Sequence, residues 1–190
     1  MAIHKHLLWL ISLCIANLSH AMQPIVLTGN AHTYELPGHI DVLEDEAGNW
    51  TIDDIMAPER GSQFLPNANG ILRIEGLNTA HWLRFKVQNT SVESRHMILE
   101  VRPHSLNYLD VYVSSESGLK RWKAGDALAF HERFVEYRQF IFPLTIASNQ
   151  TSTVYVRIKS NARTRVSAIL VDATEFLLKS HEETLIAGIM

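Results

Sequence analysis

Aromatic and charged side chains occupy the polar positions of several alternating segments, and this combination suits the binding of a small polar ligand. Aromatic rings provide a flat apolar surface, while Asp and Arg make directional, charge-assisted hydrogen bonds. The residues in these positions are Trp82, Arg84, Tyr108, Asp110, Tyr112, Trp122, Tyr137 and Arg138. Because Trp and Tyr are also common in strands for packing reasons, each aromatic residue has a purely structural alternative.

Motifs for catalysis and for metal binding are weak or absent in the sequence. His131-Glu132 and His181-Glu182 lack the second histidine, four residues after the first, that a zinc-protease helix requires. The sequence has no G-x-S-x-G motif before a helix and no glycine-rich phosphate loop. The acidic residues 41–46 lack the alternating carboxylates of a calcium loop, which favours a solvated turn. The sequence therefore predicts no cofactor and no metal site.

The first 21 residues have the three parts of a secretory signal peptide. Lys5 lies in a polar start, residues 7–18 form an apolar run, and Ser19-His20-Ala21 places small residues at a cleavage site. An uncleaved anchor is the alternative, but the apolar run is shorter than the ~20 residues of a membrane span. We therefore expect cleavage after Ala21, which also removes the single cysteine, Cys14.

The pattern of the rest of the chain predicts strands separated by turns. Its net charge of -3 gives no support to nucleic-acid binding, and its hydrophobic content of 46% is ordinary for a folded domain. Alternating apolar and polar residues occur at 81–88, 97–101, 108–113, 137–144, 154–159 and 166–170, and less clearly at 26–36, 40–45, 71–75 and 119–123. This pattern predicts an all-β fold, a jelly-roll-like antiparallel β-sandwich, over residues 22–173.

Two segments favour a helix instead. Thr51 and Asp54 have the spacing of a capping box, which predicts one short helix that ends before Pro58. A second helical segment covers residues 174–190, where a polar stretch is followed by an apolar run from Leu185 to Met190. This segment could pack on the sandwich. We instead expect a juxtamembrane segment and the start of a truncated transmembrane helix, because an exposed apolar run is unusual at the end of a domain.

The order of several short motifs resembles a known family. The motifs are Trp82-Leu83-Arg84-Phe85 with Asn89, Leu109-Asp110-Val111-Tyr112, Gly118, Gly125-Asp126, Arg138 with Phe140 and Phe142-Pro143-Leu144, and Tyr155-Val156-Arg157-Ile158, preceded by Leu43-Glu44-Asp45, Gly48 and the short helix. Over residues 42–176 the chain resembles the type 2 extracellular domain of bacterial seven-transmembrane receptors with diverse intracellular signalling modules.

The resemblance implies a periplasmic domain that binds carbohydrate-like or other small ligands. In that family, seven transmembrane helices and a cytoplasmic output domain, often a diguanylate cyclase or a histidine kinase, follow the extracellular domain. This sequence ends where the first of those helices would begin, so we expect the membrane bundle and the output domain to be missing from it. The chain is then exported and lies on the periplasmic side of the bacterial inner membrane.

The resulting hypothesis is a non-catalytic, ligand-sensing domain. Trp82, Tyr108 and Tyr112 would stack on the ligand, while Arg84, Asp110, Asp126 and Arg138 would orient it. One alternative is a protein-interaction module that forms a homodimer through exposed aromatic residues. Another is a glycan-active enzyme, for which Asp110 and Glu136 are the only carboxylate pair worth testing.

Overall fold

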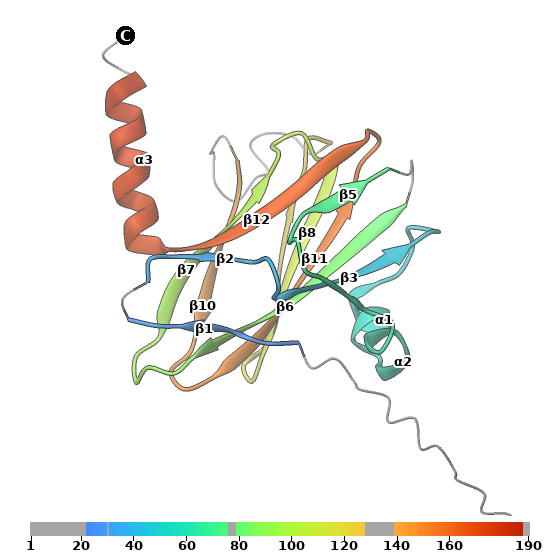
Figure 1. Ribbon diagram of the computed structural model, residues 1–190, viewed down its shortest axis with the longest axis horizontal. Helices are drawn as coiled ribbons and strands as arrows, with labels where there is room; N and C mark the ends of the chain where they lie inside the picture. The colour runs from blue at the N-terminus through green and yellow to red at the C-terminus, as the bar shows by residue number, and fades with distance from the viewer. Residues whose placement is uncertain (1–21, 30, 76–78, 128–138, 188–190) are drawn as a thin grey trace, which may run out of the picture.

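Two β-sheets face each other in a sandwich (Figure 1). The computed structural model describes residues 22–29, 31–75, 79–127 and 139–187. The larger sheet has the order β4 (Leu65–Asn67), β3 (Ile40–Asp45), β6 (Ala80–Asn89), β11 (Thr151–Lys159), β8 (Tyr108–Ser115) and β9 (Gly118–Ala124), with β1 (Ile25–Leu27) also paired to β6. The smaller sheet has the order β10 (Phe140–Ile146), β7 (Arg95–Arg102), β12 (Thr164–Asp172) and β2 (Thr33–Glu35), with β5 (Leu72–Ile74) also paired to β12.

The expected all-β sandwich is confirmed, with differences in detail. From β6 to β12 the chain crosses between the two sheets at every step except the β8–β9 hairpin, so sequence neighbours mostly face each other across the core. The single strand expected over residues 26–36 is two strands, because the chain leaves the larger sheet after β1 and enters the smaller sheet at β2. β1 is also parallel to β6, whereas an antiparallel sheet was expected.

The main core lies between the inner faces of the two sheets. Leu83, Phe85 and Val87 point inward from β6, while Leu99 and Val101 do so from β7. All five side chains are buried, and alternate residues of each strand point the other way. Burial of such side chains supplies the main stabilisation of a sandwich, at roughly 25 cal/mol for each Å² of apolar surface removed from water.

Two short helices cover part of the outer face of the larger sheet. The first, α1 (Ile52–Met56), begins with the expected capping box, in which the Thr51 hydroxyl accepts from the Asp54 amide and the Asp54 carboxylate accepts from the Thr51 amide. The second, α2 (Pro58–Gly61), was not expected; Pro58 ends α1 but suits the first turn of a new helix. Ile55 of α1 and Phe64 after α2 are buried against this outer face.

The third helix, α3 (Ala173–Ala187), follows β12 directly and projects away from the sandwich (Figure 1). Leu177 and Leu178 on it are 66% and 61% exposed. Within the described part of the chain, no helix has the length and apolar character needed to cross a membrane.

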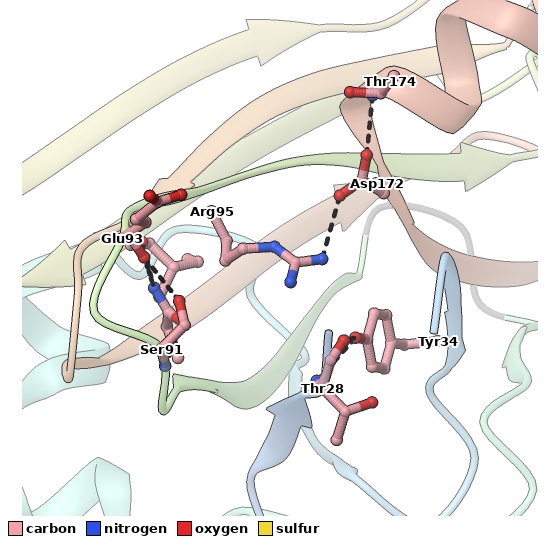
Figure 2. Close-up of polar contacts among 9 residues, drawn as sticks. Thr28, Tyr34, Ser91, Glu93, Arg95, Asp172 and Thr174 are labelled. Atoms are coloured by element: carbon pink, nitrogen blue, oxygen red, sulfur yellow. Dashed lines mark hydrogen bonds and ion pairs between the residues drawn. The ribbon is translucent and has the colours of Figure 1, made fainter. Parts of the chain in front are cut away.

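A carboxylate ties the start of α3 to the sandwich (Figure 2). Asp172 accepts a hydrogen bond from the Thr174 amide at 2.9 Å and forms an ion pair with Arg95 of β7 at 3.1 Å. Burial alone would raise the pKa of Asp172, but the Thr174 amide, Arg95 and the Glu175 amide together outweigh it and hold the pKa below its ordinary value. The carboxylate therefore links the helix start to a neighbouring strand of the smaller sheet.

A buried histidine makes stability depend on pH. His81 of β6 is 5% exposed, and its Nε2 atom lies 3.9 Å from the Glu44 carboxylate. Burial lowers the pKa of His81 below 6.5, and Glu44 opposes this only in part. The unfolded chain therefore binds a proton at a higher pH than the folded chain does. The stability contributed by neutral His81 is complete above pH 6.5 and is lost as the pH falls toward the folded pKa.

We accordingly expect the melting temperature of the wild-type chain to fall on acidification below pH 6.5, and His81→Gln to reduce that dependence. Thermal unfolding followed by circular dichroism across this range measures both slopes. His104→Gln is the matched control, because His104 is exposed. Equal slopes for the wild type and His81→Gln would contradict the assignment.

Candidate functional site

The polar side chains of the larger sheet form two rows on its outer face. The strand register places Trp82, Arg157 and Asp110 side by side across β6, β11 and β8. The next row contains Arg84, Tyr155, Tyr112 and Arg121 across β6, β11, β8 and β9. Because alternate residues of a strand share a face, all seven point away from the main core. The sheet therefore presents aromatic and charged groups together, next to α1.

A pocket of about 280 Å³ lies between this face and the start of α1. One wall comes from the segment that leads into the helix and the other from β8, β9 and β11. The lining residues are Trp50, Thr51, Ile52 and Asp53 on the first wall, and Asp110, Tyr112, Arg121 and Arg157 on the second. The volume of this pocket is just below the range of about 300–1,000 Å³ that is common for small-molecule sites.

Buried polar groups hold the first wall in place. Asp45, which is fully buried, accepts hydrogen bonds from the amides of Gly48 and Trp50 at 2.8 and 2.9 Å. Arg157 donates from Nη2 to the Gly48 carbonyl at 2.7 Å. The Arg60 guanidinium lies 3.8 Å from the centre of the Trp50 ring. The loop between β3 and α1 is thus anchored to the sheet, and the pocket wall is formed before any ligand binds.

An aromatic cluster supports the second wall. Tyr112 lines the pocket, and the Trp82 ring stacks on it with the ring centres 5.8 Å apart and the planes at 27°. Beside them, Tyr155 packs edge-on against Phe64 at 6.5 Å. Burial raises the pKa of Tyr112, and the Asp110 carboxylate adds to the rise. The Tyr112 phenol is therefore neutral at physiological pH and able to donate a hydrogen bond.

The charges that line the pocket cancel. Asp110 pairs with Nη2 of Arg121 at 3.2 Å and with Nη1 of Arg157 at 3.8 Å. Asp53 makes no ion pair with any residue in the described ranges, and so its carboxylate remains free to accept hydrogen bonds. Two carboxylates and two guanidinium groups give no net charge.

One buried donor in the pocket lining has no partner. The Nε atom of Arg157 is buried and makes no hydrogen bond within the described part of the chain. A buried donor of this kind is uncommon in folded proteins and calls for a specific reason. Because the atom has almost no accessible surface, a ligand in the pocket cannot reach it.

The structure brings together two of the residues expected to bind a ligand, Asp110 and Tyr112, which both line the pocket. Trp82 and Arg84 lie on the same face, but the contacts around them stabilise the fold and leave neither available to a ligand. Trp82 is fully buried beneath the helices, so it supports Tyr112 from behind and has no surface on which a ligand could stack. Arg84 pairs with Asp41 at 2.8 Å and donates to the Gly61 carbonyl, which commits its guanidinium to the fold.

Two other expected residues, Tyr108 and Asp126, lie elsewhere. Tyr108 is exposed at the start of β8, opposite Lys159, and does not line the pocket. Asp126 lies in the turn after β9, where its amide donates to the Leu106 carbonyl. Arg138 and Glu136 lie outside the described residues, so the structure does not place them. Among the described residues, no group of three or more His, Cys, Asp or Glu side chains could hold a metal ion.

Six lining residues were not expected from the sequence as ligand contacts: Trp50, Thr51, Ile52, Asp53, Arg121 and Arg157. Arg157 occupies a polar position of an alternating strand, and Trp50 comes directly before the capping box. Both signals are visible in the sequence. Neither indicates a pocket without the pairing of β11 with β8 and the fold of α1 onto the sheet.

Comparison with solved structures gives distant similarities in fold. A β-glucosidase from Kluyveromyces marxianus in complex with glucose is 10% identical, with a TM-score of 0.42 over 71% of this chain and 16% of that chain. The enzymatically active domain of tailspike protein 4 from bacteriophage CBA120 is 9% identical, with a TM-score of 0.31 over 70% and 17% of the two chains. A carbohydrate-binding module of the β-sandwich superfamily is 9% identical, with a TM-score of 0.30 over 74% and 54%.

All three TM-scores are below 0.5, so these similarities do not indicate a shared function. The chain also spans only a small part of the two larger proteins. No curated protein matches the sequence significantly. A protein-family model does match: residues 37–172, which include the pocket and every strand except β1 and β2, fit the family described as 7TMR-DISM extracellular 2, and the chain belongs to that family.

Proposed function

We propose that this chain is the ligand-sensing, extracytoplasmic domain of a membrane receptor and that it binds a small, uncharged, hydroxyl-rich molecule such as a carbohydrate. Membership of a receptor extracellular-domain family supports the placement outside the cytoplasm. The signal-peptide pattern of residues 1–21, which lie outside the described ranges, is consistent with export to the periplasm. The observation that carries the ligand class is the pocket beside α1, with the partly exposed Trp50, the exposed Asp53 carboxylate and balanced charge.

The chemistry of the pocket matches a hydroxyl-rich ligand in three ways. Trp50 is partly exposed and offers apolar ring surface, which suits the C–H face of a sugar ring. A hydroxyl can accept from the exposed Arg121 guanidinium and donate to the Asp53 carboxylate, since one O–H group serves both roles. A charged ligand would gain little, because the lining already has no net charge.

The same contacts support binding without catalysis. Asp110 is paired with two guanidinium groups, so its carboxylate oxygens are already engaged within the protein. In an intact receptor, the ligand would act by binding one arrangement of the domain and its following helices more tightly than another. α3 leaves the smaller sheet at β12, so the signal would have to pass from the larger sheet through the sandwich core.

Calorimetric titration of the purified chain with a panel of neutral sugars, amino acids and organic acids tests this proposal. We expect a neutral sugar to bind, and Asp53→Asn and Arg121→Gln each to weaken binding about tenfold, which corresponds to about 1.4 kcal/mol. Both side chains are exposed, so these variants should fold normally. Asp126→Asn, an exposed acidic residue outside the pocket, is the matched control and should bind as the wild type does.

Three results would contradict the proposal. The first is binding of only the charged compounds in the panel. The second is binding by the two variants as tight as that of the control. The third is recovery of the sugar in hydrolysed form. Chromatography of the titrated sugar distinguishes binding from turnover.

A further inference from the structure

Three arginines at the β5–β12 edge of the smaller sheet have no acidic partner. Arg73, Arg163 and Arg165 are exposed and make no ion pair with any residue in the described part of the chain. The other described arginines each contact a carboxylate or an aromatic ring: Arg60 with Trp50, Arg84 with Asp41, Arg95 with Asp172, Arg102 with Glu100, and Arg121 and Arg157 with Asp110. The three unpaired arginines are therefore unlike the rest.

The strand register concentrates these charges. Arg73 of β5 lies directly opposite Arg165 of β12, and both side chains point away from the core because Leu72, Ile74 and Val166 beside them are buried. Like charges at directly opposite positions destabilise a strand pair. An anion between the two guanidinium groups would relieve this repulsion.

A pocket of about 500 Å³ lies at this position. It is lined by Arg73, Ile74, Glu75, Arg163, Thr164 and Arg165. Three guanidinium groups and one carboxylate give a local charge of +2, in a chain whose net charge is -3. This pocket belongs to the smaller sheet and shares no residue with the pocket beside α1.

We propose that this second pocket binds a tetrahedral dianion, a phosphate or sulfate group. Guanidinium groups donate pairs of parallel hydrogen bonds to the oxygens of such groups. A phosphate monoester carries about -1.5 to -2 at pH 7, which balances the local charge, whereas a single carboxylate does not. Glu75 at the rim would repel additional negative charge and could accept from a hydroxyl next to the bound group. The site does not depend on the neutral-ligand pocket.

Thermal unfolding of the purified chain in phosphate, sulfate, acetate and chloride at matched ionic strength provides the first test. Phosphate and sulfate also stabilise proteins generally, by exclusion from their surface. The informative quantity is therefore the difference between the wild type and Arg165→Gln in the same salt. We expect phosphate and sulfate to raise the melting temperature more for the wild type than for Arg165→Gln, and acetate and chloride to show no such difference.

Lys120→Gln removes one positive charge from an exposed position of β9 on the other sheet and is the matched control. It should respond to phosphate as the wild type does. Without phosphate, Arg165→Gln should be at least as stable as the wild type, because the substitution removes the Arg73–Arg165 repulsion. Arg163→Gln, outside the paired strands, is a second variant if Arg165→Gln folds poorly.

Calorimetric titration with inorganic phosphate and with glycerol 3-phosphate gives the affinities and identifies the source of the group. Tighter binding of the ester would indicate that the natural ligand carries its phosphate on a larger molecule. Tighter binding of the free ion would indicate inorganic phosphate. Arg165→Gln should weaken both about tenfold or more. Equal phosphate responses in the wild type, Arg165→Gln and Lys120→Gln would overturn the proposal. Asp53→Asn should leave phosphate binding unchanged, which separates this result from the sugar experiment.

Discussion

Trp82→Ala is expected to lower the free energy of unfolding by about 3–5 kcal/mol, the usual cost of truncating a large buried aromatic side chain. Trp82 is fully buried between the larger sheet and the two short helices. Its removal would leave a cavity next to Ile55 and take away the ring that stacks on Tyr112. Chemical denaturation followed by circular dichroism measures the loss, with an unchanged denaturant slope showing that the folded state stays compact.

Tyr108→Ala is the matched control for this prediction. Tyr108 points to the same side of the larger sheet, but it is 44% exposed and lies outside the aromatic cluster. Its truncation should change the free energy of unfolding by only about 0.5 kcal/mol. Similar losses in the free energy of unfolding for the two substitutions would mean that α1 and α2 do not cover Trp82 in solution. Trp82 would then again be a candidate ligand contact.

Arg84→Ala is expected to have an effect of similar size for an electrostatic reason. The Asp41 side chain is 5% exposed and pairs with Arg84 at 2.8 Å. Removing the guanidinium leaves a buried carboxylate without its partner, which typically costs about 3–5 kcal/mol. The substitution also removes the hydrogen bond to the Gly61 carbonyl and the contact of Arg84 with the Phe64 ring at 4.1 Å. Equilibrium denaturation again gives the value.

A double variant separates the two parts of that cost. Asp41→Ala together with Arg84→Ala removes the unpaired charge and should therefore be more stable than Arg84→Ala alone. Arg121→Ala is the matched single control, since its ion pair with Asp110 involves a side chain that is 48% exposed and should contribute about 1 kcal/mol or less. A double variant no more stable than Arg84→Ala would show that packing, and not the buried charge, accounts for the loss.

Both predictions concern residues that the sequence suggested as ligand contacts. Trp82 and Arg84 occupy polar positions in an alternating strand, and an uncovered sheet would expose them. Here the segment between β3 and β5 folds back as α1 and α2 and covers that part of the face (Figure 1). Alternation identifies which residues share a face, but it does not tell whether another element covers the face.

Local and short-range features of the fold were determined by the sequence itself. The alternation within β6, β8, β11 and β12, the capping box at Thr51 and Asp54, and the helix-breaking Pro58 depend on residues a few positions apart. The ordered motifs of the family are of the same kind, and the family match over residues 37–172 confirms them. Short-range periodicity and capping act within one element, so they are visible without knowledge of its neighbours.

The tertiary structure alone decided which of the polar residues meet. Arg157 reaches the carbonyl of Gly48, 109 positions earlier in the chain, and Asp110 lies beside Arg157 only because β8 pairs with β11 in one register. Arg73 faces Arg165 for the same reason, across β5 and β12. A shift of that register by one residue would send these side chains to the opposite face. Register and the covering of a face depend on contacts between distant segments, and for this reason both pockets were found only in the folded chain.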